Sequence, residues 1–160
     1  MAIRHVLVER PPHAVWCVLG DPATYARWVP GTDRTRPGAG RWPDVGSKLR
    51  YTVKAGPFRL HGHTIVRVCE SGRRLELEAF AGWLGSARIA IELIGWGDGT
   101  LVIVDEHPLR GLGGNLHMAP TDFVLHLRHR RMLAHLACVV EEAPRAACQE
   151  AAAAAGGGSS

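Results

Sequence analysis

The strongest constraint on the fold is a series of short alternating segments in the middle of the chain, separated only by tight turns. Between residues 48 and 107, apolar and polar residues alternate with the two-residue period of a β-strand. Sequences such as Ser71-Gly72 and Gly97-Asp98-Gly99 are typical of hairpin turns. No helix-length segment separates the strands, which favours antiparallel pairing over β-α-β units. The predicted strands cover residues 48–54, 58–70, 74–80, 86–94 and 100–107.

The N-terminal part is expected to form one strand and two short helices. Residues 3–9 alternate as a strand, which Pro11-Pro12 end. A short helix is predicted over residues 13–19. Asp21 is a good N-cap for a second short helix that continues to Trp28. The following stretch, residues 34–46, is rich in proline and glycine and is predicted to be a loop with weak strand character.

The C-terminal part is expected to hold one long helix, over residues 121–143, after a glycine-rich loop at 108–120. A sheet with one apolar face has to bury that face against another element. With a rise of about 1.5 Å per residue, only this helix is long enough to do so. We therefore predict an α+β domain over residues 1–143, in which a curved antiparallel sheet wraps around the long helix. Residues 144–160 end in AAAAAGGGSS and are expected to be a disordered, low-complexity tail.

Helical periodicity divides the long helix into faces. One apolar face is predicted to consist of Leu125, Met132, Leu136 and Val139, with Leu133 and Val140 beside them. A second apolar stripe is predicted to consist of Phe123, Leu127, Ala134 and Cys138. The polar wedge that should face water consists of Arg128, Arg131, His135 and Glu142. Asp122, His126 and His129 are spaced i, i+4 and i+7, so they are neighbours on the apolar side.

Composition narrows the class of protein. The net charge is +4, but Lys and Arg are spread along the chain and no nucleic-acid-binding motif is present, so no nucleic-acid partner is expected. No apolar run approaches the roughly 20 residues of a membrane span. Arg4 and Glu9 interrupt any signal-like segment at the N-terminus, which indicates a cytoplasmic protein.

The four cysteines form no CxxC pair, and we expect buried reduced thiols.

Residues near the N-terminus carry a resemblance to a known family. The segment VERPPHAVWCVLGDPATYARWVPG resembles the start of the polyketide cyclase/dehydrase and lipid-transport proteins of the START-like (SRPBCC) superfamily. The matching positions are Pro12, Val15, Trp16, Asp21, Tyr25, Trp28 and Pro30. The turns at 70–75 and at Gly99-Thr100 also look like turns of that family, and the resemblance covers residues 3–142.

The resemblance implies a helix-grip fold with an interior cavity, the whole being one domain. Members bind polyketide intermediates, lipids, sterols or plant hormones, and some catalyse cyclisation, aromatisation or dehydration. No family-wide catalytic signature can be carried over to this sequence, so function has to be argued from the site itself.

The residue types near the expected cavity indicate candidates for binding and for chemistry. A histidine suits general-base catalysis because its ordinary pKa is near 6.5, and the candidates are His129, His126 and His107. The candidate ligand-binding residues are Trp28, Trp83, Leu125, Met132, Leu136 and Asp122. Alternation does not decide whether Asp105 and His107 or Glu106 face the interior. His61 and His63 share a strand face but have no obvious third ligand, so neither a metal nor a cofactor is expected.

Three functions follow from the resemblance together with these residues. The first is binding of a small hydrophobic molecule, polyketide-like or lipid-like, in an internal cavity without chemistry. The second is a polyketide cyclase, aromatase or dehydratase that uses a cavity histidine as general base, so that enzymatic activity stays open. The third is an interaction module, for which a large exposed apolar patch would be the sign. The oligomeric state also stays open, a homodimer included.

Overall fold

The computed structural model describes residues 2–55, 57–82, 85–110, 119–146, 148 and 149. The side chains of residues 2, 55, 58, 110 and 119–129 lie outside this description. The elements in chain order are β1 (Ala2–Val8), α1 (Pro12–Leu19), α2 (Tyr25–Trp28), β2 (Thr32–Pro37), β3 (Lys48–Ala55), β4 (Phe58–Glu70), β5 (Arg74–Phe80), β6 (Ser86–Trp96), β7 (Gly99–Arg110) and α3 (Ala119–Glu142).

The seven strands form one antiparallel sheet in the order β1-β7-β6-β5-β4-β3-β2. From β2 to β7, strands adjacent in sequence pair with one another, as hairpin turns require. β1 pairs with β7, so the first and last strands of the chain meet at one end of the sheet. The curved sheet and long C-terminal helix are the helix-grip architecture, as the sequence predicts.

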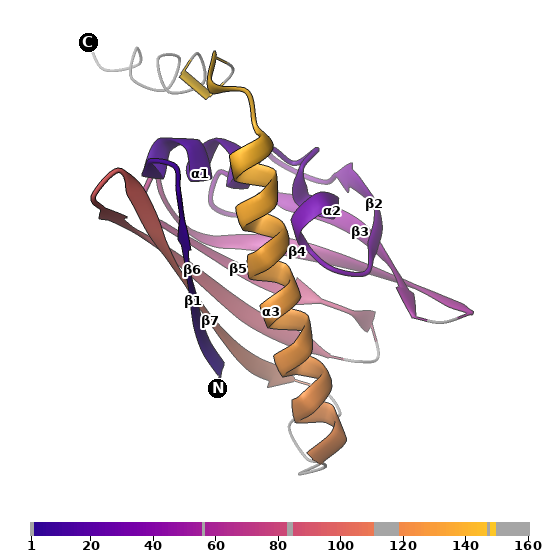
Figure 1. Ribbon diagram of the computed structural model, residues 1–160. Helices are drawn as coiled ribbons and strands as arrows, with labels where there is room; N and C mark the ends of the chain where they lie inside the picture. Colours follow the sequence, from indigo (N-terminus) through magenta and orange to yellow (C-terminus); the bar gives the residue numbers. More distant parts are fainter. Residues whose placement is uncertain (1, 56, 83–84, 111–118, 147, 150–160) are drawn as a thin grey trace.

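The helix α3 crosses one face of the sheet, and its C-terminal end lies next to α1 and α2 (Figure 1). We call the sheet face toward α3 the inner face and the opposite one the outer face. The buried inner side chains belong to the same hydrophobic core as the second half of α3. In the sheet they include Leu49, Val66, Leu75, Leu77, Ile91, Val102 and Val104.

The second half of α3 agrees with the predicted first apolar face but not with the second. Met132, Leu133, Leu136, Val139 and Val140 are all buried. Ala134 and Cys138 are exposed, because this half of α3 contacts the rest of the domain along one side only. The second apolar stripe is therefore not part of the core in this half. Arg131, His135 and Glu142 face water as predicted.

Two further expectations are corrected. Residues 32–37 form β2, although this region was expected to be mainly loop, because their backbone pairs with β3 at the sheet edge. Cys148, inside the segment predicted to be disordered, is only 2% exposed, and residues 145, 146, 148 and 149 are helical. In the described part of the chain, no helix combines the length and apolar composition of a membrane crossing.

Candidate functional site

The candidate site is the inner face of the sheet together with α2 and α3, the helices that carry the predicted residues Trp28, Asp122 and Leu125. The second half of α3 is closed against the core, as its buried side chains show. Two of the predicted ligand-binding residues, Met132 and Leu136, lie in this closed half and are 4% and 1% exposed. They therefore belong to the hydrophobic core between α3 and the sheet.

Most of the predicted residues on α3 lie in its first half. The helix contains Asp122, Leu125, His126 and His129. Its backbone is therefore helical at the i, i+4 and i+7 positions of Asp122, His126 and His129, as the prediction of one shared face requires. Their side chains are outside the described residues, as is the whole of Trp83.

Trp28 offers a buried hydrogen-bond donor. The residue is the last of α2, its side chain is 1% exposed, and the indole packs edge-on against the Tyr25 ring, with the ring centres 5.1 Å apart. Within the described part of the chain, its Nε1–H group has no hydrogen-bond acceptor. Buried indole N–H groups usually have a partner, so this donor is the candidate group for binding a ligand oxygen.

The structure shows which side chains of β7 lie on the inner face of the sheet. Val102 and Val104 are buried on the inner face, and Glu106 follows them with the same alternation. Glu106 is partly buried and lies opposite Ala2 of β1, while Arg4 of β1 lies opposite Val104. Arg4 and Glu106 are thus diagonal neighbours on the inner face, and both take part in interactions. The sequence left this choice open because both faces of the strand begin with apolar residues.

His107 consequently lies on the outer face. Its side chain is 43% exposed, and Nδ1 lies 3.4 Å from the Asp105 carboxylate on the same face. It is opposite the exposed Arg88 of β6. The interior position expected for His107 does not agree with this register. The arginines considered as partners for an inward carboxylate, Arg67 and Arg88, instead pair with Glu78 and Glu76 on the outer face.

Other histidines of the sheet also point outward. His61 Nδ1 is 3.1 Å from the Thr52 hydroxyl, and His63 stacks on Phe80 with ring centres 4.6 Å apart. Among the described residues, no group of three His, Cys, Asp or Glu side chains is arranged to hold a metal ion.

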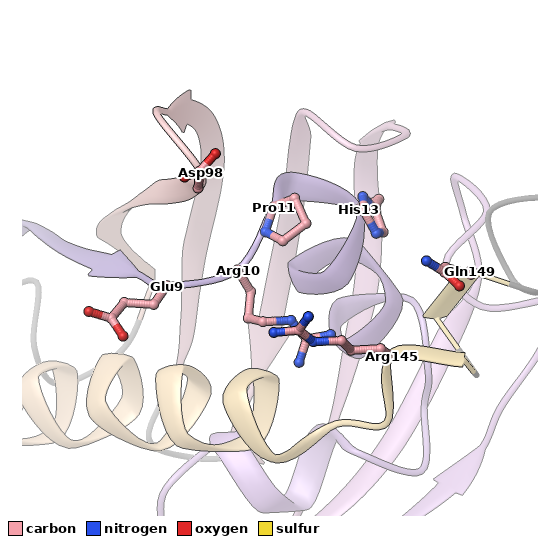
Figure 2. Close-up of a pocket in the computed structure, with 7 residues that line it drawn as sticks. All are labelled: Glu9, Arg10, Pro11, His13, Asp98, Arg145 and Gln149. Atoms are coloured by element: carbon pink, nitrogen blue, oxygen red, sulfur yellow. The ribbon is translucent and has the colours of Figure 1, made fainter.

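Two surface hollows formed by described residues lie away from the inner face of the sheet. The first, of about 300 Å³, is at the junction of β1 and α1, and Figure 2 shows Glu9, Arg10, Pro11 and His13 around it with Asp98 and Arg145. Arg10 donates from Nη1 to the carbonyl oxygens of Val140 and Ala143 at the C-terminal end of α3, at 3.1 and 3.0 Å. Its role there is to cap the helix. The second hollow lies on the outer face of β2, β3 and β4.

The fold defines the class: an α+β helix-grip protein. The family described as "Polyketide cyclase / dehydrase and lipid transport" matches residues 4–141, and the chain belongs to this family. No curated protein sequence matches the chain.

Solved structures agree on the fold. Protein CV1439 from Chromobacterium violaceum is similar with a TM-score of 0.68 at 18% identity, over 89% of this chain and 98% of that one. Ara h 8.0201 is similar with a TM-score of 0.72 at 9% identity, over 89% and 97%. The Zhui aromatase/cyclase from Streptomyces sp. R1128 is similar with a TM-score of 0.65 at 15% identity, over 88% and 92%. At these identities the likeness concerns the fold.

Proposed function

We propose that the protein binds a small hydrophobic molecule, polyketide-like or lipid-like, between α3 and the inner face of the sheet, beside α2. The observation that carries the proposal is the buried Trp28 N–H group, which has no acceptor among the described residues. An apolar guest with one carbonyl or hydroxyl oxygen fits such a donor, because apolar walls bind the body of a ligand and a few polar groups fix its orientation. Family membership supports the same class of ligand.

The test measures binding of an uncharged fluorescent probe, N-phenyl-1-naphthylamine, together with native mass spectrometry for a co-purified small molecule. Trp28→Phe keeps an aromatic ring and removes the N–H donor, so we expect weaker binding of a carbonyl-bearing ligand found in this way. Trp96→Phe is the control, because Trp96 is 64% exposed on β6. A protein that binds neither the probe nor a co-purified molecule would disprove the proposal.

A cyclase, aromatase or dehydratase activity is the alternative, supported by the family description and by the likeness to the Zhui aromatase/cyclase. Such chemistry needs a base for a carbon acid and a donor for the enolate oxygen. His126 or His129 would be the base, and the Trp28 N–H group the donor. His129→Gln and His126→Gln should then remove turnover of a poly-β-ketone without unfolding the protein. His107→Gln is the matched control, since His107 lies on the outer face. Full turnover in both α3 variants would exclude this mechanism.

A role in protein association is favoured by apolar side chains on the outer face near β1. Ile3 and Leu7 of this edge strand are 57% and 53% exposed, and Ile94 of β6 is 44% exposed. We propose a second copy of the chain as the partner, because an edge strand can meet its own copy about a two-fold axis. Light scattering after size exclusion should show a dimer that Leu7→Lys converts to a monomer. A monomer at all concentrations would contradict this.

A further inference from the structure

The outer face of β2, β3 and β4 collects basic side chains from three strands. Arg34 and Arg36 come from β2, Arg50 from β3 and Arg59 from β4, and all four are exposed. They line one hollow of about 430 Å³, together with Thr52 and His61. We call these four arginines with Thr52 and His61 the arginine hollow. None of the four makes an ion pair with an acidic residue in the described part of the chain.

The positive charge of the whole chain is concentrated in this region. Residues 32–63 hold seven of the 19 Lys and Arg residues and two of the 15 Asp and Glu residues. This segment therefore has a net charge of +5, and the rest of the chain has −1. The only acidic side chain lining the hollow, Asp33, is bound by Lys54 at 3.0 Å. The hydrogen bond from Lys54 lowers the pKa of Asp33, and the charges of Lys54, Arg59 and Arg34 lower it further.

The arrangement of these charges is unfavourable without a bound anion. Arg36 and Arg50 lie directly opposite each other in the β2–β3 pair, and like charges at such positions repel. Protection of the edge strand β2 would explain Arg34 and Arg36, since charged residues at a sheet edge discourage pairing with other chains. It does not explain Arg50 and Arg59, because β3 and β4 are paired on both sides.

We propose that the arginine hollow binds a small ligand that carries two or more phosphate groups. Guanidinium groups bind phosphate oxygens with paired N–H donors, which suits arginine better than lysine. The positive charge of the four guanidinium groups is larger than one phosphate group can neutralise. The volume of the hollow is within the range of small-molecule sites. The site lies on the opposite face of the sheet from the proposed hydrophobic site and does not depend on it.

The experiment is calorimetric titration of the full chain with inorganic tripolyphosphate at low ionic strength. The variant R36Q/R50Q should bind at least about tenfold more weakly, since it loses charge-assisted hydrogen bonds. The control R27Q/R73Q removes two arginine charges from elsewhere on the surface and should change the affinity by less than about twofold. Binding of N-phenyl-1-naphthylamine by R36Q/R50Q should equal that of the wild type, which separates this site from the hydrophobic one.

Three outcomes would overturn the proposal. The first is no binding of tripolyphosphate by the wild type. The second is equal weakening in both double variants, which would mean a response to net charge alone. The third is binding only to vesicles containing phosphatidylserine or to a single-stranded oligonucleotide. That result would mean that the outer face binds an extended polyanion.

Discussion

The Tyr25 hydroxyl lies 3.0 Å from the Thr64 hydroxyl and joins α2 to the middle of the sheet. Both residues are buried, Tyr25 at 2% and Thr64 at 0% exposure. The Tyr25 ring also contacts Trp28, Trp42 and Tyr51. This bond therefore holds the short helix that carries Trp28 at a fixed position over the inner face.

Removing the hydrogen bond between Tyr25 and Thr64 should destabilise the protein without changing the contacts of the Tyr25 ring. Tyr25→Phe keeps the aromatic ring and leaves the buried Thr64 hydroxyl without this partner, so we expect a loss of about 1–2 kcal/mol in the free energy of unfolding. Thr64→Val should cost a similar amount. Urea unfolding of the double variant should show less than the sum of the two losses, by about 0.5–1.5 kcal/mol. Strict additivity would mean that the two hydroxyls do not interact.

The cap that Arg10 supplies to α3 should contribute measurably to stability. Arg10→Met removes the guanidinium donor from the carbonyl oxygens of Val140 and Ala143, at a site where Arg10 is 8% exposed. Val140 keeps the Ala143 N–H as a donor at 3.3 Å. We expect a loss of about 1.5–3 kcal/mol and a fall in Tm of several degrees, measured by calorimetry. Arg73→Met is the control, because its side chain is 81% exposed. Equal Tm values for the two variants would show that the cap contributes nothing.

Much of the fold could be predicted because its signals are local. Alternation and turn residues place β3 to β7 close to their observed bounds, and the periodic segment at 121–143 matches α3. β2 lacks such a signal, since it is polar, ends in Pro37 and forms through backbone pairing with β3. Whether Ala134 and Cys138 are buried depends on which side of α3 contacts the sheet, which periodicity alone does not determine.

The site was less predictable because it depends on long-range register. Glu106 faces inward because β7 is fixed between β1 and β6. It lies opposite Ala2 and Ile89, which are 104 and 17 positions away in sequence. The arginine hollow requires residues of three strands to meet, although along the sequence they are separated by up to 27 positions and form no motif. Trp28 was predicted as a ligand-binding residue because it is a large aromatic residue, and it also matches the family pattern of the opening segment.

Gly62 should tolerate no side chain. A Cβ atom at this position would lie 2.3 Å from the Phe80 carbonyl oxygen and 2.7 Å from the Tyr51 ring. The Tyr51 hydroxyl donates to the same Phe80 oxygen at 3.1 Å, so the ring cannot move away without losing that bond. We expect Gly62→Ala to destabilise the protein by about 3 kcal/mol in urea unfolding. In the control Gly95→Ala the nearest atom is 3.9 Å away, and a small gain or no change is expected. Equal effects of the two variants would contradict the close packing of Tyr51 on Gly62.

The four cysteines should differ in reactivity. Burial, together with a hydrogen bond to Cys148, raises the pKa of Cys17 to about 12, and burial also raises the pKa of Cys69. A raised pKa keeps the thiol protonated at pH 8, and the thiolate is the reactive form. Iodoacetamide at that pH should therefore label the exposed Cys138 first, as peptide mass spectrometry would show. In urea all four should react at similar rates, whereas labelling of folded Cys17 as fast as Cys138 would be inconsistent with its burial.

The facing pair Arg36 and Arg50 should lower the stability of the protein when no anion is bound. The two residues are directly opposite on β2 and β3, and both are exposed. Arg36→Gln removes the repulsion and should raise the free energy of unfolding by about 0.2–1 kcal/mol at low ionic strength. Salt should reduce this gain, because exposed charges are screened within about 10 Å at 0.1 M. Arg73→Gln, next to Glu70 at 4.0 Å, serves as the control and should give no gain. If Arg36→Gln instead destabilises the protein at every salt concentration, the guanidinium group stabilises the β2–β3 pair, and the charge cluster is not under repulsion.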